Sequence, residues 1–214
     1  MTLVIQTHHD HDVVEITFND SKRRNALGLE MFEGLELALQ QIQGDTRCVL
    51  LRGDGAVFCA GFDMKACAND ITILESYINK LSTIIRLLRR IPCPVVVAAH
   101  GGAIAGGCAL LTGCDFIIGE RNGKYGYPVH QLGISPSVTI PTLFQRIGQG
   151  KTRSLLMGGE VIDGNQAFQI GLLTSLCETS KEVETVARVL ASDLAAKPPV
   201  AIQATKQWLN ELDG

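Results

Sequence analysis

Two glycine-containing segments have residue types that could stabilise a negative charge on a substrate. The first spans residues 58–65 (FCAGFDMK), and the second spans residues 100–108 (HGGAIAGGC). Each follows an apolar run typical of a buried strand and leads into a plausible helix, which predicts two strand-to-helix turns. Because the first amides of a helix have no intrahelical acceptor, two such turns could aim N–H groups at one carbonyl oxygen. The pattern therefore predicts an oxyanion hole.

Apolar periodicity predicts the elements that must position these turns. Strands are expected at residues 3–7, 12–18, 47–52, 94–99 and 115–119. Helices are expected at residues 29–43, 71–91, 106–113, 137–147, 150–157, 163–169, 181–196 and 199–211. Residues 124–136 are rich in turn formers and are expected to be irregular. The loosely recurring β–β–α rhythm predicts an α/β fold with a stacked, spiral core under a helical C-terminal layer.

Composition limits the class of protein. With 214 residues, of which 46% are hydrophobic, the chain is expected to form one domain with a sizeable core. Its net charge of −3 argues against nucleic acid as a partner. The basic clusters at 22–24 and 86–90 are interpreted as solvated charge or, alternatively, as sites for phosphate groups. No secretory signal or long apolar span is evident, so we expect a cytoplasmic protein that does not bind membranes.

The cysteines and histidines predict no metal site. The seven cysteines form no Cys-x-x-Cys motif and have no complementary histidine pair, so they are expected to be small buried hydrophobes. Cys59 lies beside the first turn and is a candidate nucleophile, although no activating base is near it in the sequence. The cluster at residues 8–12 (HHDHD) falls in a predicted turn and is not expected to hold a functional metal.

Several short motifs, in order and spacing, resemble the crotonase, or enoyl-CoA hydratase/isomerase, superfamily over nearly the whole chain. Beside the two glycine segments, the similarity is carried by residues 25–27 (NAL), 125–128 (YGYP), 132–136 (LGISP), 146–148 (RIG) and 167–172 (AFQIGL). The resemblance implies a crotonase-like spiral of repeated ββα units with a C-terminal helical layer. It also implies a substrate presented as a coenzyme A thioester, with no permanently bound cofactor.

The resemblance assigns roles to residues of both turns. The thioester carbonyl would accept hydrogen bonds from the backbone N–H groups of Phe62 and Gly106, which would stabilise an enolate-like intermediate. The positions that would contact the nucleotide and pantetheine of coenzyme A are Arg24, Ala26, Ala60, Asp63 and Met64, and Lys22 or Lys65 could reach a phosphate. The Asp63 side chain is equally well interpreted as a helix N-cap.

Two positions depart from the pattern of the family's hydratases. Those enzymes use two glutamates as general acid and base, and the corresponding residues here are Ala109 and Val129. Neither side chain can transfer a proton, so ordinary hydration of an enoyl-CoA is not expected.

Other candidates for the chemistry lie near the presumed site. Ser137 occupies the position of a glutamate in some isomerases and of a nucleophilic aspartate in dehalogenases, but it could also be a helix N-cap. His130 has a pKa range suited to acid–base catalysis, and Tyr127 could donate a hydrogen bond. His100 is interpreted as a satisfied buried residue, with catalysis as the alternative.

The C-terminal part of the chain is shorter than the resemblance implies. Relatives continue beyond the position of Gly214 with helices that pack on a neighbouring subunit. We expect a spiral core over residues 1–195 and the start of a shortened helical region over 196–214. A homo-oligomer, a trimer or hexamer, is expected from the resemblance.

The sequence leaves three functional hypotheses open. The favoured one is an acyl-CoA enzyme that stabilises a thioester enolate and performs decarboxylation, isomerisation or hydrolysis. The second is a hydratase or isomerase that uses another base. The third is a non-catalytic relative that binds acyl-CoA or forms oligomers.

Overall fold

A computed structural model describes residues 2–42, 44–67 and 70–212, and its main feature is a six-stranded sheet. The strand order is β1-β2-β3-β4-β6-β9, with β1 antiparallel to β2 and all other neighbours parallel. The strands are β1 (Val4–His9), β2 (Val13–Phe18), β3 (Cys48–Gly53), β4 (Val95–Ala99), β6 (Phe116–Glu120) and β9 (Ser175–Cys177).

A second, three-stranded sheet lies beyond β4 and carries part of the second glycine segment. Its order is β5-β7-β8, formed by β5 (Gly102–Ile104), β7 (Lys124–Gly126) and β8 (Val161–Asp163). Strands β5 and β7 are parallel, whereas β7 and β8 are antiparallel. This sheet turns the chain after β4, so that the second turn faces the first.

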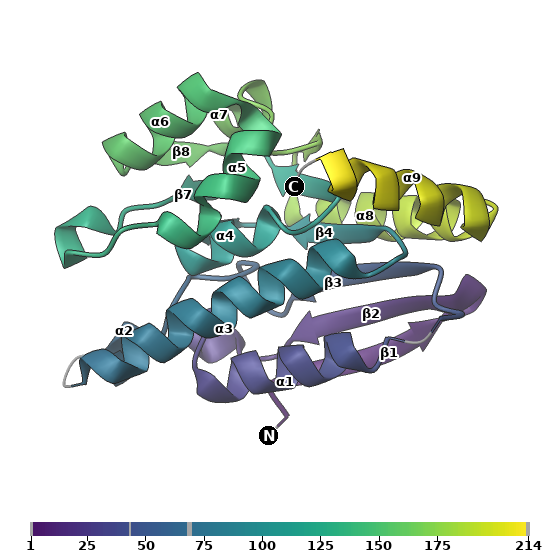
Figure 1. Cartoon of the computed structure of the whole chain (residues 1–214), viewed down its shortest axis with the longest axis horizontal. Coiled ribbons are helices and arrows are strands. Elements are labelled where there is room, and N and C mark those ends of the chain that lie inside the picture. The colour runs from purple at the N-terminus through teal and green to yellow at the C-terminus, as the bar shows by residue number, and fades with distance from the viewer. Residues whose placement is uncertain (1, 43, 68–69, 213–214) are drawn as a thin grey trace.

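The main sheet is buried on both faces because its strands alternate between two cores. Val49 and Leu51 of β3 pack with helices α1 (Leu29–Gln40) and α3 (Ile71–Arg90), whereas Cys48 and Leu50 pack with α8 (Ser180–Ala195). Successive side chains of a strand point to opposite faces, which explains the continuous apolar runs in the sequence. Helices α1 and α3 run side by side across the front of the molecule in Figure 1.

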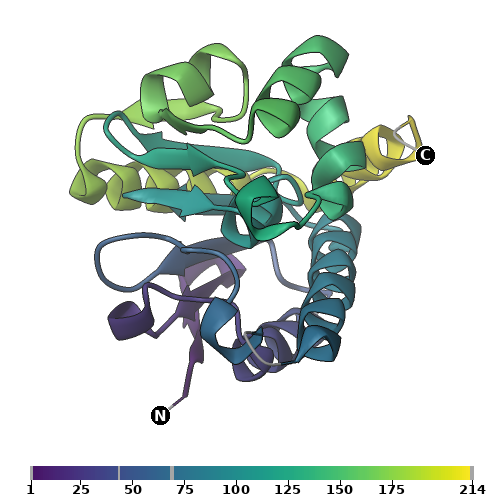
Figure 2. The same cartoon turned by 90° about the vertical axis from the view of Figure 1, so that its left-hand side faces the viewer.

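Six further helices complete the described part of the molecule around the two sheets. They are α2 (Met64–Cys67), α4 (Gly106–Leu111), α5 (Ile140–Ile147), α6 (Gln149–Gly158), α7 (Gly164–Gln169) and α9 (Pro199–Leu212). Figure 2 shows α3 on one side of the molecule and α9 extending beyond it near the C-terminus. None of the helices in the described part of the chain is long and apolar enough to cross a membrane.

The structure confirms the expected strands and helices to within a few residues at their ends, with two corrections. Residues 124–136 are not wholly irregular, because Lys124–Gly126 form β7 and His130–Leu132 form a 3₁₀ helix. The helix expected from residue 137 is a 3₁₀ turn at Ser137–Thr139 followed by α5 from Ile140. Strands β5, β8 and β9 are too short to show a period in the sequence. The predicted boundary between a spiral core over residues 1–195 and a C-terminal helical region over 196–214 stays a prediction.

Candidate active site

The two glycine turns are in direct contact. A Cβ on Gly61 would lie 2.8 Å from the carbonyl oxygen of Ile104 and 3.5 Å from the amide nitrogen of Gly106. A Cβ on Gly106 would lie 2.8 Å from Cε1 of Phe62. The turns therefore approach so closely that side chains at these two glycines would collide with the opposite turn.

Backbone hydrogen bonds fix the register of the two turns. The amide of Ile104 donates to the carbonyl of Cys59 at 3.0 Å, and the amide of Leu27 donates to the carbonyl of Gly61 at 2.8 Å. Among the residues that the structure describes, neither the Phe62 amide nor the Gly106 amide has a hydrogen-bond acceptor. Both predicted donors therefore lie in contacting turns with their N–H groups unpaired, as an oxyanion hole requires.

The backbone before Gly106 has an unusual conformation. Ala105 is the N-cap of α4 and has φ +50°, a region that residues other than glycine seldom adopt. Its amide donates to the carbonyl of Gly126 at 2.8 Å, which ties the turn to β7. Strained backbone of this kind is often found at functional sites, where the surrounding structure holds it.

A cavity of about 160 Å³ opens beside the two turns. Phe62 and Gly106 line it, together with Ala109 and Val129, the residues at the positions of the hydratase glutamates. No carboxylate, imidazole or cationic side chain lines this cavity in the described part of the chain. The cavity wall is apolar apart from the hydroxyl groups of Tyr127, Ser135 and Thr139 and the backbone.

Tyr127 is the polar side chain best placed for chemistry in this cavity. It is buried, its hydroxyl lies 3.0 Å from Oγ1 of Thr139, and both residues line the cavity. Burial raises the pKa of Tyr127 well above its usual value. The phenol therefore keeps its proton at neutral pH and can donate a hydrogen bond.

The structure does not bring His130, Ser137 or His100 into this cavity. His130 is exposed, and its Nδ1 would lie 2.9 Å from a Cβ on Gly159. Ser137 is exposed and forms no capping hydrogen bond, since Pro136 holds the N-cap position; its expected capping role is therefore wrong. His100 is buried with Nε2 3.1 Å from the carbonyl of Gly55, but its Nδ1 has no partner among the described residues, so it is only half satisfied.

The residues expected to contact coenzyme A are brought together along one edge of the site. The amide of Ala60 donates to the carbonyl of Arg24, and the amide of Asp63 donates to the carbonyl of Leu27. Ala26 and Met64 flank these pairs, and Met64 lines the cavity. The carboxylate of Asp63 lies 3.5 Å from the guanidinium of Arg23 rather than on a helix amide.

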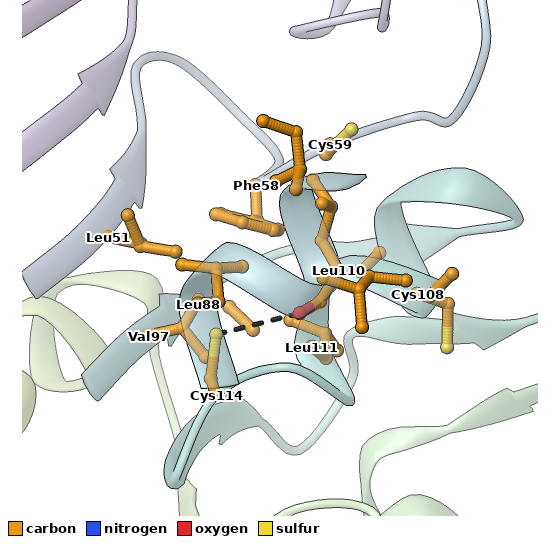
Figure 3. Close-up of a cluster of buried hydrophobic side chains, with 14 of the residues drawn as sticks. Leu51, Phe58, Cys59, Leu88, Val97, Cys108, Leu110, Leu111 and Cys114 are labelled. Atoms are coloured by element: carbon orange, nitrogen blue, oxygen red, sulfur yellow. Dashed lines mark hydrogen bonds between the residues drawn. The ribbon is translucent and has the colours of Figure 1, made fainter. Parts of the chain in front are cut away.

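The cysteines of the core have no nucleophilic character. Figure 3 shows Cys59, Cys108 and Cys114 among apolar side chains such as Leu110 and Leu111. The Cys59 thiol donates to the carbonyl of Asn25, and burial raises its pKa to about 12. A buried thiol with a raised pKa is a structural residue, which argues against Cys59 as a nucleophile.

Two further residues support the site, and only one of them carries a signal in the sequence. Asn25 is fully buried and its amide nitrogen donates to the carbonyls of Asp54, Val57 and Phe58, which anchors the first turn. Thr139 lies twelve residues from Tyr127, its partner, across a segment without regular period. The Asn-Ala-Leu motif pointed to Asn25, whereas only the tertiary contact identifies Thr139.

Comparison with known proteins agrees with this architecture. The family model for enoyl-CoA hydratase/isomerase matches residues 8–212. The chain is 30% identical over 220 residues to 1,2-epoxyphenylacetyl-CoA isomerase of Escherichia coli, covering 98% of this chain and 82% of that protein. It is 30% identical over 203 residues to short-chain-enoyl-CoA hydratase of Clostridium acetobutylicum, covering 92% of this chain and 77% of that protein.

The solved structures extend the comparison to the fold. The crystal structure of an enoyl-CoA hydratase from Mycobacterium smegmatis superposes with a TM-score of 0.92 at 25% identity, over 99% of this chain and 83% of that one. The structure of an enoyl-CoA hydratase from Bacillus anthracis superposes with a TM-score of 0.91 at 28% identity, over 97% of this chain and 82% of that one. The crotonase-like α/β fold expected from the sequence is therefore confirmed, and the chain belongs to the enoyl-CoA hydratase/isomerase family.

Proposed function

We propose that this protein is an enzyme that binds a coenzyme A thioester and stabilises its enolate with the backbone N–H groups of Phe62 and Gly106. The observation that carries the proposal is the contact between two turns whose amides have no acceptor in the described part of the chain. Coenzyme A is part of the substrate, held along residues 24–26 and 60–64. The expected homo-oligomer and cytoplasmic location stay predictions.

Decarboxylation of a malonyl-type thioester is the reaction that this cavity supports best. The bond between the α-carbon and the carboxylate breaks, CO₂ leaves, and the electron pair passes to the thioester oxygen as an enolate. This step needs an oxyanion hole but no general base, and the described residues lining the cavity include no carboxylate or imidazole that could be one. The apolar wall also favours loss of a charged carboxylate as neutral CO₂.

Tyr127 is the proposed proton donor that completes the reaction. The enolate must take a proton at its α-carbon, and the hydroxyl of Tyr127, which lines the cavity and is protonated at neutral pH, is the group proposed to supply it. Its neighbour Thr139, whose hydroxyl oxygen is 3.0 Å away, can hydrogen-bond the phenolate that forms. Water then returns the proton.

A second candidate reaction is isomerisation of an acyl-CoA. It is favoured by the 30% identity to the 1,2-epoxyphenylacetyl-CoA isomerase of Escherichia coli. Isomerisation also passes through a stabilised thioester oxyanion, so it would use the same two amides, and a double-bond shift would in addition need a group that moves a proton. Hydration or hydrolysis would require a base that the described lining of the cavity lacks.

The test is mass spectrometry of a mixed panel of malonyl-type, 2-enoyl and 3-enoyl thioesters incubated with the purified protein. We expect loss of CO₂ from the malonyl-type members. Gly106→Ala should slow turnover by roughly 10²–10³-fold, because its Cβ would collide with Phe62 and displace an oxyanion-hole donor. Gly150→Ala is the matched control, since a Cβ there has nothing within 4 Å.

Other outcomes would separate the remaining hypotheses. A product of unchanged mass but different chromatographic retention would identify an isomerase, a gain of water a hydratase, and free coenzyme A a hydrolase. No conversion across the panel, with binding retained, would favour the non-catalytic relative over the enzyme.

A further inference from the structure

The basic cluster at residues 86–90 lies where the last turns of α3 meet α9. Both views of the fold show the C-terminal end of α3 beside α9 (Figure 1, Figure 2). Arg86, Arg89 and Arg90 line a groove between these two helices. The described residues that line this groove and those that line the active-site cavity do not overlap, so the cluster belongs to a separate surface.

Two of these arginines present their charge to the groove. Arg86 and Arg90 are exposed and lie one helical turn apart, so their side chains leave the same face of α3. In the part of the chain that the structure describes, neither pairs with a carboxylate, and Arg86 has one long hydrogen bond, 3.4 Å, to the Thr83 hydroxyl. The negative end of the helix dipole explains a cation in the last turn, where Arg90 lies, but not Arg86 one turn earlier.

The opposite wall of the groove offers side-chain amides. Helix α9 contributes Gln203 and Gln207, which are also one turn apart. Gln207 donates one amide hydrogen to the carboxylate of Glu211 at 2.9 Å and keeps the other for a ligand. Glu211 is the only acidic side chain among the described residues that line the groove. The lining therefore combines a surplus of positive charge with uncharged N–H donors.

Two contacts hold the walls of the groove together. The side-chain amide of Asn210 donates to the carbonyl of Arg89 at 2.8 Å. The ammonium of Lys206 donates to two carbonyls, one at the end of α3 and one in the segment that follows it. Lys206 is buried and lies 2.8 Å from the carboxylate of Asp115, so it supports the groove and leaves the ligand to the arginines. A preformed groove lowers the entropic cost of binding.

We propose that this groove binds a phosphate group through the guanidinium groups of Arg86 and Arg90 and the side-chain amides of Gln203 and Gln207. A guanidinium presents a planar fork of N–H donors that matches two phosphate oxygens. A phosphate dianion can accept from both arginines and from an amide at once, whereas a carboxylate has one charge and two oxygens. The site is independent of the proposed function, because it shares no described residue with the active-site cavity.

The experiment measures binding by isothermal titration calorimetry at constant ionic strength, because salt screens exposed charges. The probes are inorganic phosphate, sulfate, acetate and AMP. At pH 8 we expect phosphate and sulfate to bind with similar affinity, and acetate at least about tenfold more weakly. Between pH 8 and pH 5 phosphate changes from a dianion to a monoanion while sulfate keeps its charge, so phosphate binding should weaken relative to sulfate binding.

Variants of α3 and α9 locate the site. The double variant Arg86→Gln, Arg90→Gln should bind phosphate at least about tenfold more weakly than the parent, because it loses the charged donors. Lys151→Gln, Arg153→Gln is the control, since it removes the same charge from exposed positions on α6 outside the groove. Its affinity for phosphate should stay within about twofold of the parent. Glu211→Gln removes the acid from the lining and should strengthen phosphate binding.

The outcomes decide between a site and a general response to charge. An equal loss of phosphate binding in both double variants would show that net charge alone attracts the anion, and the proposal would fail. Undetectable phosphate binding, or equal affinity in the arginine variant and the parent, would also overturn it. AMP that binds more tightly than phosphate and loses this affinity in the arginine variant would identify a nucleotide as the source of the phosphate group. AMP binding that does not depend on the arginines, while phosphate binding does, would identify the free anion.

Discussion

The space around Gly106, rather than its backbone conformation, requires glycine at this residue. A Cβ there would lie 2.8 Å from Phe62 Cε1 and 3.2 Å from Leu27 Cδ1. Gly61 differs, because it combines a φ of +91° with contacts to the opposite turn. The candidate oxyanion hole thus depends on two glycines for two separate physical reasons.

A glutamate introduced at position 109, where the family's hydratases have one, tests how apolar the cavity is. In Ala109→Glu, burial in the apolar wall should raise the pKa of the new carboxyl. The folded protein then binds the proton more tightly than the unfolded chain, so stability is retained below about pH 4 and falls as pH rises through the raised pKa. Urea unfolding at pH 5 and pH 8 should show this loss, and Ala204→Glu at an exposed position should show none.

The buried thiols of Cys59 and Cys108 should make stability depend on alkaline pH. Burial raises the pKa of both from 9.0 to about 12, so the unfolded chain ionises first. Their effect is small at pH 8 and lowers the free energy of unfolding as pH rises from about 9 to 12, by roughly 1–2 kcal/mol per thiol at pH 10.

The measurement compares urea unfolding at pH 8 and pH 10. Between these pH values, the free energy of unfolding should fall in both proteins. In the double variant Cys59→Ala, Cys108→Ala the fall should be smaller than in the parent by roughly 3 kcal/mol. Cys67→Ala, which removes a half-buried thiol, should give a smaller change. Equal pH dependence in the double variant and the parent would contradict the assignment.

At the scale of elements, one buried side chain adds to the backbone hydrogen bonds that hold the first turn. Asn25 donates to the carbonyls of Asp54, Val57 and Phe58, and its Oδ1 accepts from the amide of Asp20. It therefore joins the segment before α1 to the loop that follows β3.

Removal of this amide should loosen the turn. Asn25→Ala leaves buried backbone groups without their partner, and we expect the free energy of unfolding to fall by about 3 kcal/mol. Chemical denaturation provides the measurement. Asn19→Ala serves as the control, because Asn19 donates one exposed hydrogen bond to the carbonyl of Thr2; a similar loss in both variants would argue against the anchoring role.

At the scale of the whole molecule, α9 is attached to the core through a buried lysine. The Nζ of Lys206 donates to the carbonyls of Leu88 and Cys93 and lies 2.8 Å from the carboxylate of Asp115. Asp115 also accepts from the amide of Val95 at the start of β4. One ammonium group therefore joins α9, the end of α3 and the main sheet.

Lys206→Met should remove these bonds and weaken the attachment of α9 to α3 and the main sheet. We expect the free energy of unfolding to fall by about 2 kcal/mol, less than for a fully buried pair because the Asp115 side chain is 32% exposed. Limited proteolysis should cut within Pro199–Leu212 sooner than in the parent. Lys151→Met removes an exposed hydrogen bond to the carbonyl of Ile170, and it should change neither the free energy of unfolding nor the rate of proteolysis.

The amino-acid sequence by itself predicted the two glycine turns, the long helices and the longer strands, and its motifs identified the family by resemblance. These features depend on local rules: an apolar period identifies a strand or helix, and glycine marks a turn that a side chain would obstruct. The loss of both glutamates is also a property of the sequence, since it needs only the identities of Ala109 and Val129.

Only the tertiary structure decided which polar groups reach the cavity. His130 is adjacent to Val129 in the chain but turns outward, and Thr139 lies twelve residues from Tyr127 but places its hydroxyl 3.0 Å from the phenol. Short strands such as β5 and β8 also depend on pairing between distant segments, which carries no local period. The direction of a side chain follows from how the whole chain packs, and for that reason the oxyanion turns could be predicted from the sequence while the chemistry around them could not.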